Sequence, residues 1–159
     1  MKRIIPFILV LFLFAGCEIK EYTPEIPLSF TQRAEVISGD FSFECEICKT
    51  EENVVVTALS TDAEGMAMTY NGNELCFVYD NYSHSIDGSS FEPSNTAIIV
   101  YEVFESIVSN ETQGRKIDGG YQYDGKITIG DFSMIQKDDN TLKSISVRSA
   151  GINIEFEQI

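Results

Sequence analysis

The sequence predicts a mainly β fold with one helix (α+β), in which a strongly curved antiparallel meander surrounds an amphipathic helix. After Ser29, most of the chain alternates apolar and polar residues with the period of two that is typical of strands with one buried face. Short turn signals separate these runs, so successive strands should pair as antiparallel neighbours. A single segment, from Ser94 to Ser109, carries its apolar residues at helical spacing instead.

The first half of the expected meander is a series of alternating runs. They cover residues 30–36, 41–48 and 66–70, with a strongly β-branched run over residues 54–59 among them, and the chain then returns through residues 75–79. Turns are expected at Ser38-Gly39-Asp40 and at Lys49 to Asn53. Asn71-Gly72 predicts a two-residue hairpin turn, since both of its central positions need positive φ.

The helix is expected to begin after Pro93, at Ser94-Asn95. Its apolar stripe holds six residues at helical spacing, and three more widen it: Ala97, Val100, Tyr101, Phe104, Ile107 and Val108, then Ile98, Ile99 and Val103. A stripe this broad indicates a helix with sheet on more than one side. We therefore expect the helix to occupy the concave face of the sheet.

Strands resume after the helix. Tyr121 and Tyr123 are expected to lead into a turn at Asp124-Gly125, followed by strands over residues 126–129 and 132–134. The chain closes as a hairpin of residues 142–148 and 152–156 around Ala150-Gly151. About ten strands in meander order are many for one flat sheet, so we expect the sheet to curl.

The N-terminus has the pattern of a secretory leader. Lys2 and Arg3 precede an uncharged apolar run that is shorter than the ~20 residues needed to span a bilayer. The run ends in Ala15-Gly16-Cys17, which resembles the lipobox of bacterial lipoproteins, with Phe14 where leucine is more usual. We expect residues 1–16 to be removed and Cys17 to carry acyl chains, such as palmitate, that anchor the protein in the cell membrane on its extracytoplasmic side. The alternative is an ordinary leader followed by a chance cysteine.

Cleavage leaves a strongly acidic chain. The sequence has 11 Lys and Arg and 25 Asp and Glu, and loss of Lys2 and Arg3 leaves nine cations and a net charge of −16. Such a charge disfavours nucleic acid and anionic lipid head groups as partners. Residues 17–28, with Pro24 and Pro27, are expected to form a lipidated tether, and residues 29–159 a single domain that we expect to be a monomer.

The order of elements resembles the LolA-type lipoprotein carrier fold and a group of small lipoproteins of Clostridia-like bacteria. The matching parts are residues 65–72, which read Gly-Met-Ala-Met-Thr-Tyr-Asn-Gly, the helix from Pro93, and the closing stretch from Leu142 to Phe156. The resemblance implies a half-barrel with an apolar cavity. It does not imply carrier activity, because a carrier must move freely and this chain is expected to be tethered.

The sequence offers little for catalysis or for metal binding. His84 is the one histidine, and no Gly-x-Ser-x-Gly turn accompanies it. Cys45-Glu46-Ile47-Cys48 is a CxxC motif on an expected strand, where the acids nearby disfavour a thiolate. Zinc would need a second ligand pair, and only Cys76 and His84 remain. We expect no enzyme activity, no cofactor and no metal, and three free thiols, with Cys45 facing inward and Cys48 and Cys76 outward, three strands apart.

Two classes of function remain. The first is a membrane-anchored, non-enzymatic binding domain that holds a lipid or other hydrophobic ligand between sheet and helix. Its expected cavity is lined by aromatic and methionine side chains of inward parity: Phe41, Phe43, Met66, Met68, Phe77, Tyr79 and Phe104. In the second class the same side chains fill a packed core, and the protein is a surface interaction or sensor module without a small-molecule ligand.

Overall fold

The computed structural model describes residues 26–110 and 112–157; the leader, Cys17 and most of the expected tether lie outside the described residues. Within that range, one 14-residue helix, α2 (Thr96–Ser109), and two short 3-10 turns, η2 (Gly88–Ser90) and η3 (Arg148–Ala150), accompany a single sheet. Its eleven strands are β1 (Phe30–Ser38), β2 (Phe41–Lys49), β3 (Val54–Ala58), β4 (Ala67–Tyr70), β5 (Glu74–Tyr79), β6 (Tyr82–Asp87), β7 (Arg115–Ile117), β8 (Gly120–Ile127), β9 (Gly130–Lys137), β10 (Leu142–Val147) and β11 (Ile152–Phe156).

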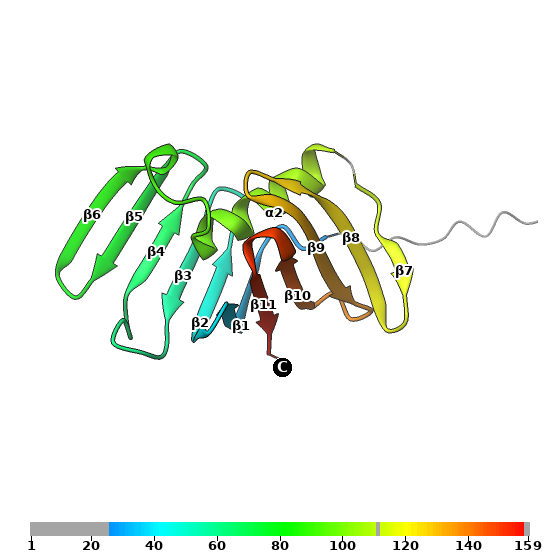
Figure 1. Ribbon diagram of the computed structural model, residues 1–159, viewed down its shortest axis with the longest axis horizontal. Coiled ribbons are helices and arrows are strands. Elements are labelled where there is room, and N and C mark those ends of the chain that lie inside the picture. The colour runs from blue at the N-terminus through cyan, green and yellow to red at the C-terminus, as the bar shows by residue number, and fades with distance from the viewer. Residues whose placement is uncertain (1–25, 111, 158–159) are drawn as a thin grey trace, which may run out of the picture.

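The strands follow one another across the sheet in the order β6-β5-β4-β3-β2-β1-β11-β10-β9-β8-β7, and each pair is antiparallel. Two meanders, one on each side of the helix in the sequence, therefore join where β1 pairs with β11, with Val36 opposite Ile154. The predicted fold class is confirmed: the sheet is an open, curved half-barrel with one helix on its concave side (Figure 1).

Contacts of one helical turn show how strongly the sheet curves. The rings of Tyr101 in α2 and Tyr70 in β4 lie edge to face with centroids 5.2 Å apart. The next residue, Glu102, accepts hydrogen bonds from the backbone N–H and the hydroxyl of Thr128, just after β8, at 2.9 and 2.7 Å. Six strands lie between β4 and β8 in the sheet, which would separate them by about 34 Å if it were flat. A helix is only about 10–12 Å across, so the sheet wraps around it.

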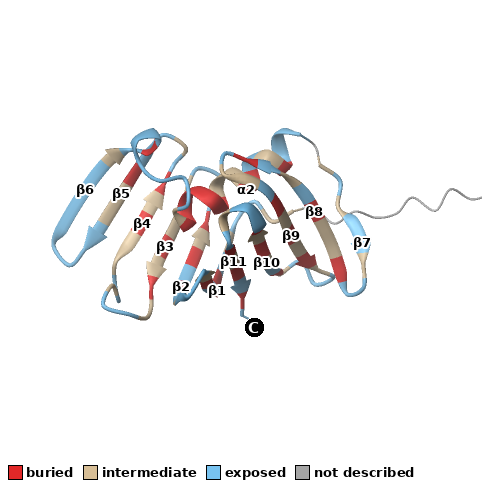
Figure 2. Cartoon of the chain, in the orientation of Figure 1, coloured by how far each residue is buried: buried red, intermediate tan, exposed pale blue. Residues whose placement is uncertain are grey.

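The core lies between α2 and the concave face. Residues opposite each other in an antiparallel pair face the same side, and Ile47, Val56 and Met68 form one such buried row across three strands. Phe104, on the helix, is 1% exposed and belongs to the same core. Figure 2 shows the buried residues gathered along the helix and the middle of the strands. Val108, which was expected in the buried stripe, is instead 50% exposed in the last turn.

Capping side chains set the ends of the helix. α2 begins at Thr96, two residues later than expected, because Asn95 is its N-cap and accepts a 2.9 Å hydrogen bond from the N–H of Ala97. At the other end, the side-chain amide of Asn110 donates to the carbonyl of Ser106 at 2.8 Å. The Asn95 side chain satisfies a backbone N–H that the start of a helix leaves without a partner, and the Asn110 amide adds a second donor to a carbonyl that also accepts the Asn110 N–H at 3.2 Å.

The expected turn at Asp124-Gly125 is wrong. β8 runs unbroken from Gly120 to Ile127, and the chain turns at Thr128 and Ile129. Gly125 serves packing instead, because a Cβ at this position would lie 2.6 Å from the ring of Phe132. Composition alone does not distinguish a glycine that permits a turn from one that permits close packing within a strand.

Two other local expectations need correction. The β4–β5 connection has three residues rather than two, and within it only Gly72 has a positive φ. Asn71 closes this turn by accepting hydrogen bonds from the N–H groups of Asn73 and Glu74 at 3.0 and 2.8 Å. Lys49, expected in a turn, is the last residue of β2 and is 3% exposed.

The last residues of the expected tether, 17–28, include one that contacts the folded domain. Ile26 falls within that segment, yet it is half-buried and packs against the core. Within residues 26–110 and 112–157, no helix is both long enough and apolar enough to cross a membrane.

Candidate functional site

The structure divides the seven side chains expected around an apolar cavity into two groups. Met68 and Phe104 belong to the packed core, where the Phe104 ring centroid lies 5.5 Å from that of Phe30. The other five are half-buried or exposed: Phe41, Phe43, Met66, Phe77 and Tyr79. A ligand at these five residues would lie beside the helix rather than beneath it.

Strand register places these exposed side chains on the concave face. Side chains two residues apart in a strand share a face. Phe43 lies two residues before the buried Cys45. Tyr79 lies two residues after Phe77, which pairs with the buried Met68. The exposed apolar residues therefore continue the face that forms the core beneath α2.

Two further aromatic side chains extend this surface, and the sequence analysis missed both. Tyr82 in β6 pairs with Tyr79 and is 79% exposed. Phe91, which follows η2, packs on Phe77 with ring centroids 5.4 Å apart. The available signal was the alternation of Tyr82, His84 and Ile86 with polar residues. We term the combined surface the aromatic face: Phe41, Phe43, Met66, Phe77, Tyr79, Tyr82 and Phe91.

The helix leaves the aromatic face largely uncovered. α2 packs chiefly on β3, β4 and β8, whereas β5 and β6 form one end of the sheet (Figure 1). Figure 2 shows β6 exposed along almost its whole length. Exposed aromatic side chains on one face of a sheet are typical of sites that bind a ligand or a partner.

A cleft opens between the helix and the turns on either side of it. It consists of two adjoining hollows of about 530 and 370 Å³, which share Tyr70, Gly72, Glu102 and Thr128. We term it the acidic–aromatic cleft, because rings and carboxylates line it: Tyr70, Asp87, Phe91, Tyr101, Glu102 and Glu105. Lys126 lines it as well.

Tyr70 is held in place in this cleft, and the charges of the cleft shift its pKa. The Tyr70 hydroxyl donates to the carbonyl of Gly72 at 2.9 Å, and a Cβ on Gly88 would lie 2.5 Å from the Tyr70 ring. Burial raises the pKa of Tyr70, and the negative charges of Glu102 and Asp87 raise it further. Both carboxylates therefore act on the same point of the cleft.

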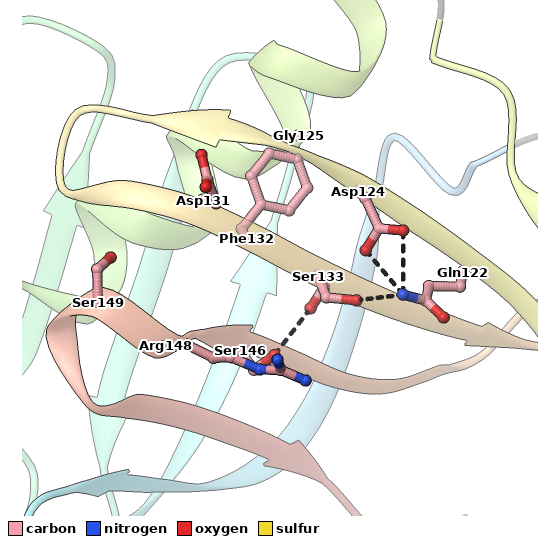
Figure 3. A pocket seen from close by; sticks show the side chains of 9 residues that line it. All are labelled: Gln122, Asp124, Gly125, Asp131, Phe132, Ser133, Ser146, Arg148 and Ser149. Carbon is pink, nitrogen blue, oxygen red and sulfur yellow. Dashed lines mark hydrogen bonds between the residues drawn. The ribbon is translucent and has the colours of Figure 1, made fainter.

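A polar cleft of about 620 Å³ lies on the opposite, convex face, over β8, β9 and β10. Figure 3 shows that its lining is linked internally. The side-chain amide of Gln122 donates to Asp124 at 2.7 Å and to the hydroxyl of Ser133 at 3.0 Å, and Ser146 donates to the Ser133 carbonyl at 3.4 Å. Arg148 also lines it. Its chemistry suits polar groups and differs from that of the aromatic face.

The three thiols lie on the faces that the strand pattern predicts. Cys45 is buried, and burial raises the pKa of its thiol to about 12. Cys48 in β2 and Cys76 in β5 lie on the outer face with β3 and β4 between them. His84 is an exposed residue of β6. Among the described residues, no group of three His, Cys, Asp or Glu side chains is placed to hold a metal ion.

Comparison with known proteins gives distant structural similarity but no match in sequence. No family model matches the chain, and no curated protein matches it in sequence. Among solved structures, the chain is similar to a LolA superfamily protein from Nitrosomonas europaea, with 12% identity and a TM-score of 0.43, over 83% of this chain and 86% of that chain. At this identity and TM-score the similarity carries no argument about ligand or activity.

Proposed function

We propose that the chain is a lipid-anchored, extracytoplasmic lipoprotein whose folded domain binds a lipid or other hydrophobic ligand and is not an enzyme. The aromatic face carries the proposal. Three of its side chains, Phe41, Tyr79 and Tyr82, are 57%, 50% and 79% exposed. A ligand that covers them is stabilised by about 25 cal/mol for each Å² of apolar area removed from water.

The anchor is proposed from the leader pattern that ends at Cys17. Cys17→Ser removes the thiol that would carry the acyl chains, so we expect an uncleaved or mislocalised precursor. Membrane fractionation with metabolic lipid labelling checks this. A processed, lipid-labelled Cys17→Ser protein in the membrane fraction would refute the anchor.

One observation favours the second candidate function, a protein-interaction module. β6 is an edge strand, and it lacks the lysine or proline that often protects such edges. A partner strand can add to an exposed edge of this kind through backbone hydrogen bonds. The two candidates differ in whether the domain alone binds a small apolar molecule.

Probe binding separates the candidates. A chain from Glu18 to Ile159 contains every described strand, the helix and the core, so it is the form to test. We expect an uncharged fluorescent alkyl probe to bind it saturably, and Tyr79→Ser to weaken binding several-fold. Val78→Ser is the matched control, since Val78 is 39% exposed on the opposite face of the same strand. If the folded wild-type chain does not bind the probe, the ligand-binding function is wrong and the protein-interaction module is the remaining candidate.

A further inference from the structure

We propose that the acidic–aromatic cleft binds the ammonium head group of an amphiphile whose alkyl chain lies along the aromatic face. The inference rests on the proposed function and adds the charge and place of the ligand's head group. Four features carry it: the continuity of cleft and face, the charge of the cleft, the fixed positions of its carboxylates, and its aromatic lining.

Phe91 joins the two surfaces. It lines the larger hollow of the cleft together with Tyr70, Asp87 and Glu102. Its ring also packs on Phe77 of the aromatic face, with centroids 5.4 Å apart. An alkyl chain attached to a head group in the cleft can therefore pass Phe91 and reach the aromatic face without crossing the helix.

The charge of the cleft favours a cation. The lining includes three carboxylates, Asp87, Glu102 and Glu105, and one ammonium, Lys126, so its side chains carry a net of two negative charges. The rest of the chain adds to this field, since its formal charge is also negative. An anionic head group would be repelled here, whereas an ammonium would be attracted.

Two of the carboxylates are already fixed in place. Glu102 accepts two hydrogen bonds from Thr128. Asp87 accepts from the N–H and the hydroxyl of Ser89 at 2.9 and 2.6 Å. Neither side chain needs to be ordered when a cation arrives, and preorganisation of this kind lowers the entropic cost of binding.

The aromatic lining suits an ammonium better than a strongly hydrated metal ion. The apolar substituents of an alkylammonium can pack on the rings of Phe91 and Tyr101, and aromatic rings attract cations. Two rings of the helix already contact an ammonium group of the protein itself. The Lys49 ammonium lies 5.8 Å from the ring centroid of Tyr101 and 5.6 Å from that of Phe104.

The test compares three amphiphiles with the same twelve-carbon chain, each kept below its micelle concentration: dodecyltrimethylammonium, dodecyl maltoside and dodecanoate. Calorimetric titration of the chain from Glu18 to Ile159 should give the highest affinity for the ammonium and the lowest for dodecanoate. Glu102→Gln and Asp87→Asn should each lower the ammonium affinity by about three- to tenfold, that is by up to about 1.4 kcal/mol, and leave the maltoside affinity unchanged. Asp87→Asn keeps the oxygen that accepts both hydrogen bonds from Ser89, and Glu102→Gln keeps one oxygen for the N–H of Thr128, so the fold should be retained.

Glu35→Gln is the matched control. It removes one negative charge from an exposed position on the convex face of β1 and should not change the ammonium affinity. Equal affinities for the three amphiphiles, or an equal effect of Glu35→Gln and Glu102→Gln, would overturn the head-group inference and leave hydrophobic binding intact. Failure of all three amphiphiles to bind would overturn the proposed function as well.

Discussion

Glu102 on the helix and Thr128 after β8 are joined by two hydrogen bonds, from the threonine N–H at 2.9 Å and from its hydroxyl at 2.7 Å, although 26 residues separate them in the chain. The preceding residue, Tyr101, packs on Tyr70 of β4. One helical turn therefore connects the two halves of the curved sheet. The same carboxylate lines the acidic–aromatic cleft, so its contributions to stability and to binding have to be separated.

Glu102→Ala should destabilise the domain by about 1 kcal/mol, because it removes the acceptor of both hydrogen bonds at a partly exposed position. Glu102→Gln keeps an acceptor for the Thr128 N–H and should lose less. Urea unfolding of the two variants measures the difference. Equal stability of wild type and Glu102→Ala would show that the contact does not hold the two halves together.

Phe104→Ala should cost about 3–5 kcal/mol of unfolding free energy, because the ring is buried in a packed core beside Phe30. The loss is large against a total stability of about 5–15 kcal/mol. Val108→Ala, at a half-exposed position of the same helix, is the control and should change the unfolding free energy by less than about 0.5 kcal/mol. A small loss for Phe104→Ala would mean that the ring borders empty space, as a ligand cavity beneath the helix requires.

Cys45 should resist alkylation in the folded protein, because it is buried and burial raises the pKa of its thiol to about 12. The half-buried Cys48 and Cys76 should react first with N-ethylmaleimide at pH 8. Their strands are three apart, about 14 Å, well beyond the roughly 7 Å that a disulfide allows. Peptide mapping without reduction checks both points, and a native bridge between any two of these residues would contradict the strand order.

Lys49→Met should be at least as stable as the wild type at pH 7. Burial lowers the pKa of the Lys49 ammonium below its ordinary value of 10.5, and Glu105 and Glu51 only partly oppose this. The unfolded state therefore binds the proton more tightly. Wild-type stability should rise with pH from the lowered folded pKa towards 10.5. Urea unfolding from pH 7 to 10 should show the advantage of Lys49→Met shrinking; a pH-independent difference would contradict this account of Lys49.

Period-two alternation was enough to predict the meander and the inward side of Cys45, because alternation reports directly which side of a strand is buried. The sequence pattern gave wrong predictions for residue types that occur both in turns and in strands. Gly125 permits the close approach of Phe132 within a strand rather than a turn. Lys49 ends a strand under the helix, where its ammonium donates to the carbonyl of Thr50 at 2.6 Å.

The candidate site was only half predictable for a different reason. The sequence pattern placed both Phe77 and Phe104 on inward-facing sides of their elements. It does not tell which inward-facing residues the helix covers. That depends on the path of α2 across the curved sheet, which leaves β5 and β6 outside its main contacts. The acidic–aromatic cleft depends on contacts between distant segments, such as Glu102 with Thr128, which no local pattern encodes.

The central claim is that an alkyl chain lies on the aromatic face, and a tryptophan reporter tests it most directly because the chain contains no tryptophan. Tyr79→Trp places the indole on the aromatic face, and Val78→Trp places it on the opposite face of the same strand. A brominated alkyl amphiphile with an uncharged head group, which quenches indole fluorescence on contact, is titrated against each variant. The account predicts saturable quenching of Tyr79→Trp and little quenching of Val78→Trp. Equal quenching of the two variants, or none of either, would contradict it.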